Sequence, residues 1–397
     1  MAKNTKPIIR FKGFTDAWEQ RKLGDVVNIY DGVHQTPDYQ DSGIMFLSVE
    51  NITTLKSEKF ISEEAFQRDY KVYPQKGDIL MTRIGDVGTP NVVETSEKVA
   101  YYVSLALLKP IKTDSYFLKN SIQSPLFQKG LKERTLVTAI PQKINKDEIG
   151  KVDIIMPVSQ SEQAVIGEYF KNLDHLITLH QRKYDSLVNV KKAMLEKMFP
   201  KNGETVPEIR FKGFTDAWEQ RKLGDLGTTF TGLSGKTAID FGHGEASFIT
   251  YMNVFTNPVS NPKMVEHVEI DSKQREVEVG DVFFTTSSET PEEVGMSSVL
   301  KEKSGVMYLN SFCFGFRPLV KFDLDYLAFM LRSESVRKQI KLLAQGISRF
   351  NISKTKMMDI EIPLSKIDEQ VAIGRYFAQL DNLITLHQRK QFLKVRR

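Results

Sequence analysis

Between residues 159 and 199 the apolar residues recur at intervals of seven, and His180 and Lys191 interrupt the pattern. The stretch holds no glycine after Gly167 and no proline before Pro200. This pattern predicts one long amphipathic helix with a coiled-coil seam, and about 40 residues at 1.5 Å each span roughly 60 Å. The predicted seam has two rows, with Ile166, Leu173, Leu187 and Met194 in one and Phe170, Ile177, Tyr184 and Met198 in the other.

A second amphipathic stretch repeats the first. Residues 369–390 match residues 162–183 at 16 of 22 positions, and both contain Leu-Ile-Thr-Leu-His-Gln-Arg-Lys. In the first copy Glu162 places a carboxylate near the first turn, where the helix dipole stabilises a negative charge. Because each helix has one apolar stripe to bury, we expect the two to pack as an antiparallel pair. The seam expected for the second helix is Ile373, Phe377, Leu380 and Ile384.

The residues before each helix show short apolar or alternating runs separated by Gly, Pro and Asp clusters, which is typical of strands and turns. Two stretches of the first region, Glu63–Asp69 and Tyr116–Arg134, predict helices, with a possible break at Ser124-Pro125. The mixture indicates an α+β domain. The strands that we expect are Val26–Tyr30, Ile44–Val49, Asp78–Arg83, Val99–Leu108 and Val152–Met156.

A nearly identical stretch opens both halves of the chain. Pro7–Val26 returns as Pro207–Leu226, with differences only at Ile8/Glu208 and Val26/Leu226. Both tryptophans, Trp18 and Trp218, lie in it. Framework runs such as Ile154–Pro157 and Ile360–Pro363 also correspond, whereas the loops between them differ. The chain is therefore one unit written twice, and a duplicated scaffold with dissimilar loops suits a protein that reads two targets with one frame.

These patterns predict two tandem α/β domains joined by two long helices packed as an antiparallel coiled coil, with a pseudo-twofold internal repeat. The boundaries that we expect are a first domain over 1–158, a helix over 159–200, a second domain over 201–364 and a second helix over 365–397. The repeated opening stretch is interpreted as frame, with specificity in the loops where the copies differ.

Composition narrows the function classes. The chain has 397 residues, a net charge of +5 and 41% hydrophobic residues, and no apolar run reaches the 18 residues that a membrane span requires. The one cysteine, Cys313, excludes an internal disulfide and a multi-cysteine zinc site, and we expect it in a buried strand of a cytoplasmic protein. The mildly basic balance permits a nucleic-acid partner without requiring one.

Motifs of catalysis are absent from the sequence. It has neither a Gly-x-x-x-x-Gly-Lys-Ser/Thr phosphate loop, nor a Gly-x-Gly-x-x-Gly dinucleotide motif, nor Gly-x-Ser-x-Gly. The Asn/Asp-Pro-Pro-aromatic tetrapeptide of amino-methyltransferases does not occur, and no histidine pair has the spacing of a metal site. We therefore expect no catalytic residue, no metal and no cofactor on this chain.

The loops of the two domains carry Gly, hydroxyl, amide and basic residues at matched positions, and these residue types contact phosphates and base edges. The candidate DNA-binding residues of the first domain are His34, Gln35, Thr36, Tyr39, Thr82, Arg83, Thr138, Gln142 and Lys143. Those of the second are Ser234, Lys236, Thr237, Thr286, Ser287, Ser288, Arg349 and Asn351.

The layout resembles the specificity subunit of type I restriction-modification systems over nearly the whole chain. The resemblance rests on Trp18–Asp25 opening each unit, on Pro157 with Glu162-Gln163 opening the helix, and on the helix ending at Lys191–Pro200. It implies two target recognition domains that each read one half of a split double-stranded DNA sequence in the major groove. The two helices would set the spacer and dock two modification subunits.

In that family, S-adenosylmethionine, ATP and Mg belong to the partner subunits, and motor and nuclease subunits add cleavage. The seam residues that we expect to contact partners are Phe170, Leu173, Ile177, Tyr184, Phe377, Leu380 and Ile384. Two other readings stay open at this point. One is a self-sufficient DNA methyltransferase or nuclease, and the other is a structural tandem-repeat scaffold without DNA binding.

Overall fold

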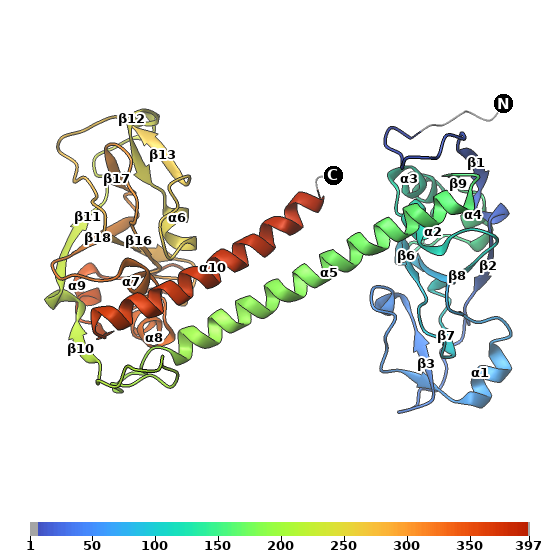
Figure 1. The fold of residues 1–397 in the computed structure, drawn as a ribbon, viewed down its shortest axis with the longest axis horizontal. Helices are drawn as coiled ribbons and strands as arrows, with labels where there is room; N and C mark the ends of the chain where they lie inside the picture. Colours follow the sequence, from blue (N-terminus) through green and yellow to red (C-terminus); the bar gives the residue numbers. More distant parts are fainter. Residues whose placement is uncertain (1–6, 396–397) are drawn as a thin grey trace. The chain divides into compact units, whose positions relative to one another are not determined.

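The structure, a computed structural model, describes residues 7–395, with side chains through Gln388. It divides into two compact units, residues 1–178 and residues 179–397, and the division falls inside one long helix. That helix, α5 (Gln160–Lys197), begins in the first unit and ends in the second (Figure 1). The expected long helix is confirmed, and the 38 residues of α5 span about 57 Å at 1.5 Å each.

The first unit is built in layers around a four-stranded antiparallel sheet of order β2-β8-β5-β6. A three-stranded sheet, β4-β3-β7, and a short ribbon, β1-β9, complete its β-structure. The strands are β1 (Glu19–Lys22), β2 (Val27–Asp31), β3 (Ile44–Leu47), β4 (Phe60–Ile61), β5 (Ile79–Ile84), β6 (Asp86–Val92), β7 (Val99–Tyr101), β8 (Leu105–Pro110) and β9 (Asp153–Met156).

The alternating direction of the side chains along β5 and β8 explains why the first unit has an apolar core on each side of its central sheet. Ile79 and Met81 face a core closed by helices, whereas Leu80 between them faces a second core closed by the three-stranded sheet. Successive side chains of a strand point to opposite faces, so a sheet covered on both sides reads as a continuous apolar run. The expected strand over Val99–Leu108 is two strands, because a turn intervenes in which the Leu105 N–H donates to the Tyr102 carbonyl at 2.9 Å.

The helices of the first unit begin directly after the residues that cap them. Helix α1 (Glu63–Asp69) has the expected bounds, and the Ser62 hydroxyl accepts from the Ala65 N–H. The predicted helix over Tyr116–Arg134 breaks at Ser124-Pro125, since Pro125 cannot continue the preceding helix and instead opens the next one. The resulting helices are α2 (Ser115–Ile122), α3 (Pro125–Arg134) and α4 (Lys146–Gly150).

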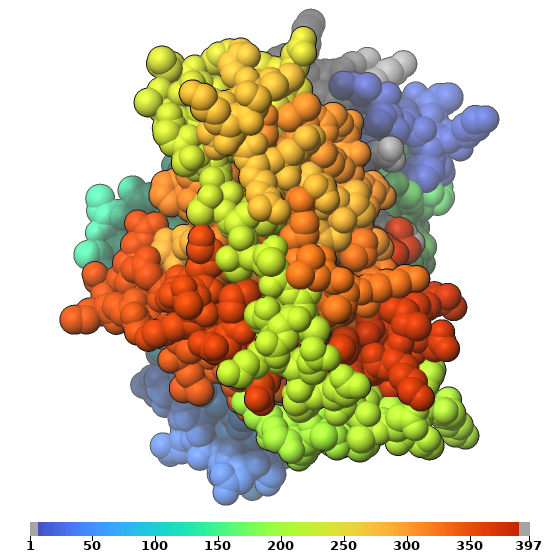
Figure 2. All heavy atoms as spheres, turned by 90° about the vertical axis from the view of Figure 1, so that its left-hand side faces the viewer, coloured from blue at the N-terminus to red at the C-terminus, as the bar shows by residue number. Residues whose placement is uncertain are grey.

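The second unit repeats this order. Its four-stranded sheet is β11-β18-β14-β16, its three-stranded sheet is β13-β12-β17, and the ribbon is β10-β20. Its strands are β10 (Glu219–Lys222), β11 (Gly227–Thr231), β12 (Phe241–Ile249), β13 (Val265–Val268), β14 (Val282–Thr285), β15 (Ser287–Ser288), β16 (Ser297–Val299), β17 (Met307–Leu309), β18 (Cys313–Pro318), β19 (Phe350–Asn351) and β20 (Glu361–Leu364). Its helices are α6 (Tyr251–Thr256), α7 (Leu324–Met330), α8 (Glu334–Leu342), α9 (Lys354–Met357) and α10 (Ile367–Val395). In Figure 2 the yellow surface of the β12–β13 region lies at one end of this unit, and the lime-green segment that follows α5 lies at the other.

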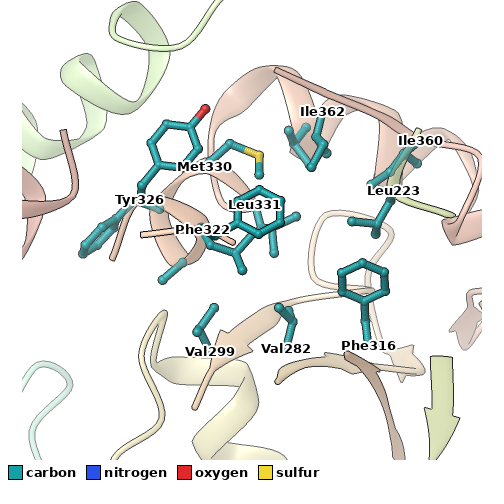
Figure 3. Close-up of a cluster of buried hydrophobic side chains, with 14 of the residues drawn as sticks. Leu223, Val282, Val299, Phe316, Phe322, Tyr326, Met330, Leu331, Ile360 and Ile362 are labelled. Carbon is teal, nitrogen blue, oxygen red and sulfur yellow. The ribbon is translucent and has the colours of Figure 1, made fainter. Parts of the chain in front are cut away.

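The core of the second unit lies between this sheet and helix α7. Figure 3 shows Val282, Val299 and Phe316 from the sheet opposite Tyr326, Met330 and Leu331. All six are fully buried. Cys313 opens β18 and is 2% exposed, as its apolar neighbours predict, and burial raises the pKa of its thiol to about 12.

Within the second unit, α10 runs antiparallel to the second half of α5. His180 Nδ1 lies 3.1 Å from His387 Nδ1, and Lys191 Nζ lies 2.5 Å from Asp381 Oδ1, so higher numbers on one helix meet lower numbers on the other. The expected antiparallel pair is confirmed. The seam differs from the prediction at the start of α10. There Ile373 and Phe377 pack against α7 in the core of the second unit.

Near its start, each long helix approaches a neighbouring helix closely at a matched glycine. A Cβ on Gly167 would collide with the Asp114 carboxylate that caps α2, and one on Gly374 would collide with Asp323, which caps α7. The glycines therefore allow each long helix to lie directly on a cap of its own unit. Among the described helices, none is long and apolar enough to cross a membrane.

Replacing Phe377 with alanine tests how much the start of α10 contributes to stability. Phe377 is fully buried among Phe199, Phe329 and Tyr376, so we expect Phe377→Ala to lower the free energy of unfolding by about 3–5 kcal/mol. The matched control is Phe170→Ala, because Phe170 occupies the same repeat position but is 40% exposed. Urea denaturation should show a much smaller loss for the control, and equal losses would contradict this account of the core.

Candidate nucleic-acid interface

The candidate residues of the first unit belong to three segments, Gly32–Gln40, Thr82–Asn91 and Thr138–Asn145, and these segments meet at Arg83. Its guanidinium pairs with Asp31, at the end of β2, and its Nε donates to the Ile144 carbonyl at 3.2 Å. Beside it the Gly85 N–H donates to the Gln142 carbonyl at 2.8 Å, and Gln142 Nε2 donates to the Gly85 carbonyl at 2.9 Å. Arg83 therefore fastens the ends of loops that lie far apart in the sequence.

Arg83 and Thr82 are buried, whereas the other candidates of this unit are exposed. Thr82 is 0% and Arg83 6% exposed, and burial lowers the pKa of the Arg83 guanidinium. The Thr82 hydroxyl accepts from the Thr89 N–H at 2.9 Å. These two side chains support the loops from beneath. The exposed candidates are His34, Gln35, Thr36, Tyr39, Thr138, Gln142 and Lys143.

The second unit builds the same loop frame from different side chains. The Ile144 N–H donates to the Arg83 carbonyl at 3.0 Å, and the Ile352 N–H donates to the Thr286 carbonyl at 3.0 Å. Likewise Leu136 pairs with Lys143 at 2.8 Å, and Gln345 pairs with Asn351 at 2.9 Å. By this correspondence Arg83 matches Thr286, and Lys143 matches Asn351. The two units therefore share these backbone hydrogen bonds, whereas the side chains at the matched positions differ.

Candidates in the second unit divide between buried and exposed positions as well. Ser287 and Ser288 are 7% and 8% exposed in β15, where Ser287 pairs with Asn351, and Thr286 is half-buried. Ser234, Thr237, Arg349 and Asn351 are exposed. Two of these loops meet at the β15-β19 pair. The structure thus brings Thr286, Ser287, Ser288, Arg349 and Asn351 together.

Lys236 is held by an ion pair of its own loop region. Its Nζ lies 2.9 Å from Asp271, which raises the pKa of Lys236 and lowers that of Asp271 to about 2. Nearby, the Ser234 N–H donates to Gln274 Oε1 at 3.0 Å. The charge of Lys236 is therefore partly neutralised within the unit, unlike that of the exposed Arg349.

Sequence reasoning missed two isoleucines at the tips of the matched loops. Ile140 is 100% and Ile347 98% exposed, which is unusual for such large apolar side chains. They lie in the segments closed by the Leu136–Lys143 and Gln345–Asn351 pairs. The signal that would have found them is an isoleucine in the corresponding loop of both copies.

The partner-contact candidates on the long helices also divide by exposure. Phe170 and Ile177 are 40% and 39% exposed, and Leu173, Tyr184 and Ile384 are half-buried. Phe377 and Leu380 are 0% and 6% exposed because they pack inside the second unit. These two therefore face the core of the chain itself and leave the middle of α5 as the exposed apolar surface.

The repeated opening stretch is tied to the start of each long helix by one buried carboxylate. Arg10 Nε lies 2.7 Å from Glu162 Oε1, and Arg210 Nε lies 2.7 Å from Glu369 Oε1. Trp18 Nε1 also donates to Glu162 at 3.2 Å. The glutamates are 1% and 2% exposed, so each serves mainly as an ion-pair partner and not only as a charge at the helix dipole.

The glutamine that follows each glutamate fastens the same junction. Gln163 Nε2 donates to the Pro157 carbonyl at 2.8 Å, and Gln370 Nε2 donates to the Ser365 carbonyl at 2.8 Å. Their Oε1 atoms accept from the N–H groups of Asp114 and Asp323, each at 3.1 Å. The repeated motif is thus a clamp between frame and helix. No group of three or more metal-ligating side chains occurs among the residues that the structure describes.

Comparison with known proteins agrees with this duplicated plan. The family model described as the type I restriction modification DNA specificity domain matches twice, over residues 15–189 and 215–393. Two proteins of Methanocaldococcus jannaschii, the type I restriction enzyme MjaVIII specificity subunit and the putative type I restriction enzyme MjaX specificity subunit, are each 24% identical. Each alignment covers 94% of this chain, with 88% and 89% of the respective relative.

Two solved structures share the fold. The S subunit of a type I restriction-modification system from M. genitalium has a TM-score of 0.57 at 12% identity, with 98% of this chain and 95% of that chain covered. A chain from a study of complex assembly and conformational transition of the type I R-M system has a TM-score of 0.51 at 14% identity, with the same coverage. With both halves matched by the family model, the chain belongs to the type I restriction-modification DNA specificity family and is the non-catalytic specificity subunit of such a system.

Proposed function

We propose that each unit of this specificity subunit reads one half of a bipartite double-stranded DNA target. The observation that carries the proposal is the shared loop frame with exchanged side chains, in which Lys143 and Asn351 occupy matched positions. Side chains that differ on a shared backbone frame are suited to contact different base edges. The proposed recognition domains are residues 1–158 and 201–364, and residues 159–200 and 365–397 are the proposed spacer helices.

Exposed loop residues are the proposed direct contacts. Lys143 and Arg349 supply positive charge for phosphates or guanine, and Gln142 and Asn351 supply amides that can pair with adenine. The buried candidates Thr82, Arg83, Ser287 and Ser288 are proposed to hold the loops in place. This division separates two kinds of variant, since loss of a contact changes DNA binding alone, while loss of a support also lowers stability.

The proposed partners are DNA and two modification subunits, with motor and nuclease subunits added through the complex. The exposed apolar surface of α5, including Phe170 and Ile177, supports docking of modification subunits on the helices. We propose that S-adenosylmethionine, ATP and Mg are bound by those partners and not by this chain. The proposed compartment is the cytoplasm, in keeping with the unpaired, buried Cys313.

Mapping methylated adenines in a genome where this chain is the sole specificity subunit tests the proposal. We expect a single motif made of two defined half-sites separated by a fixed number of unspecified bases. A continuous motif, or methylation that does not depend on this chain, would overturn the two-reader function.

Lys143→Ala tests the proposed phosphate contact. In the assembled methyltransferase we expect weaker DNA binding, with the slope of log affinity against log salt reduced by about 1 if one phosphate contact is lost. The matched control is Lys12→Ala, because Lys12 is an exposed lysine of the frame and not of a loop. Binding should be measured by fluorescence anisotropy between about 50 and 200 mM salt. An unchanged slope for Lys143→Ala would remove this residue from the interface.

A further inference from the structure

The first unit carries a basic hollow beside its candidate DNA loops. It has a volume of about 390 Å³ and lies between helix α3, strand β6 and the loop that carries Gln142. Lys129 and Lys132 of α3 line it, and no carboxylate is among its lining residues. Both lysines are exposed, and neither forms an ion pair with any residue that the structure describes. Two positive charges therefore stand at the edge of the candidate interface without a negative partner.

Helix α3 and its counterpart α8 in the second unit are anchored at the same point. Gln128 Nε2 donates to the Gly88 carbonyl at 2.7 Å, and Arg337 Nη1 donates to the Gly295 carbonyl at 2.7 Å. Both glycines have a positive φ. This shared contact aligns the two helices residue by residue. Counted from it, the matched lysines are Lys129 with Lys338 and Lys132 with Lys341.

In the second unit each of these lysines has a carboxylate partner. Lys338 Nζ lies 3.4 Å from Glu334 on the preceding turn of α8. Lys341 pairs with Glu292, which lies in the loop before β16. The hydrogen bond from Lys341 lowers the pKa of the Glu292 carboxyl, so this group is ionised near neutral pH. The second unit therefore neutralises its two lysines internally.

The first unit has uncharged residues where these two carboxylates stand. Pro125 is the first residue of α3, and Glu334 is the first residue of α8. Gly85 precedes the anchoring glycine of its unit by three residues, as Glu292 does in the second unit. Like charges three positions apart on a helix repel each other. The first unit thus keeps an uncompensated pair of lysines at the hollow, an arrangement that a bound anion stabilises.

We propose that this hollow binds the phosphate backbone of DNA, with Lys129 and Lys132 as the contacting groups. The inference rests on the proposed function, because Gln142, a proposed base contact, lines the same hollow. Phosphate contacts fix the register of a protein on the duplex and carry no sequence information. The two lysines therefore position the first reader while its loops read the bases, and α8 gives the second reader no equivalent anchor.

The salt dependence of DNA binding by the assembled methyltransferase tests the assignment. The probe is a labelled duplex that carries the mapped motif, and binding is followed by fluorescence anisotropy between about 50 and 200 mM salt. We expect the double variant Lys129→Ala/Lys132→Ala to reduce the slope of log affinity against log salt by at least about 1. The matched control is Lys338→Ala/Lys341→Ala, which should change the slope much less because its lysines are already neutralised. Equal reductions in the two variants, or no reduction in the first, would overturn the proposal.

Pro125→Glu supplies the first unit with one of the missing carboxylates and leaves both lysines in place. The new side chain stands four residues before Lys129, which is the spacing of Glu334 and Lys338, so it should pair with Lys129. We expect weaker DNA binding and a smaller salt slope than in the wild-type enzyme. Circular dichroism establishes that the variant is folded. Unchanged affinity and slope in folded Pro125→Glu would refute a role for the lysine charges.

Two further measurements separate the phosphate site from the function on which it rests. The methylated motif of Lys129→Ala/Lys132→Ala should equal that of the wild type, and an altered motif would show that these lysines read bases. A bipartite motif combined with full salt dependence in this variant would remove the phosphate site alone, whereas a continuous wild-type motif would remove the two-reader function. Sedimentation velocity without DNA should show normal assembly of the variant with modification subunits. Weakened assembly would identify an acidic surface of a partner as the occupant and overturn the proposal.

Discussion

Exchange of residues 27–156 for the corresponding segment of another specificity subunit is expected to change one half of the methylated sequence and leave the other half unaltered. The segment contains every candidate DNA-contacting residue of the first unit, including Gln142 and Lys143, and none of the second. The exchanged segment ends at Met156, so β9 is replaced together with the reader, while its partner strand β1 and helix α5 are kept. We expect the corresponding segment of another specificity subunit to supply its own strand to pair with β1.

The physical basis of this expectation is the independence of the two cores. The sheets and apolar clusters of the first unit contain residues up to Ile166, and those of the second begin at Met198. A new first reader thus repacks against its own frame and makes no demand on the second core. Methylation mapping gives the result directly. Alteration of both halves would show that the units do not read independently, and the reciprocal exchange of residues 227–363 is the matched control.

Insertion of seven residues into α5 between Leu176 and Leu179 is expected to lengthen the spacer between the half-sites while both half-sites stay the same. Seven residues add about 10.5 Å of helix, roughly three base pairs at about 3.4 Å each. A seven-residue insertion also nearly preserves the face that the helix presents, since it closely matches two turns. The point chosen is exposed, whereas Leu187 further along is buried and Lys191 pairs with Asp381.

A seven-residue insertion in the exposed loop at Lys301-Glu302 provides the control. It adds the same length to the chain without lengthening α5, so the spacer should be unchanged. Four-residue insertion at the helix site is expected to add fewer base pairs and to rotate the seam, with lower methylation activity. A changed half-site after any helix insertion would contradict the role of α5 as a ruler.

Several features of the fold were predictable because they depend on local chemistry. The seven-residue apolar period specifies α5, and the serine-proline break between α2 and α3 follows from the missing N–H of Pro125. The strands of the central sheets were found because both of their faces are covered, so they read as apolar runs. The end of the strand at Tyr101 was missed, since a turn within an apolar stretch leaves little trace in composition.

For the candidate interface, the sequence predicted which residues belong to the loops, but it did not predict which of their side chains are buried. Thr82 and Lys143 belong to loops of the same composition, yet Thr82 is fully buried and Lys143 is exposed. The difference arises because Arg83 draws the loop ends together through Asp31 and Ile144, a contact between residues about fifty to sixty positions apart. Sequence patterns register neighbours along the chain and carry no information on such pairings.

The sequence by itself determined that this protein is a duplicated α+β reader with two related helices, because repeats, apolar periods and the family motifs are written in the order of residues. Only the tertiary structure decided what each repeated residue does. Phe170 and Phe377 hold the same position in the repeated motif. Phe199 packs on Phe377, whereas Phe170 lines a hollow in the first unit. Glu162 lies in the first turn of α5, as expected, and only the tertiary structure shows that it is also the buried partner of Arg10. Burial and pairing depend on which distant segments meet, and that is a property of the folded chain.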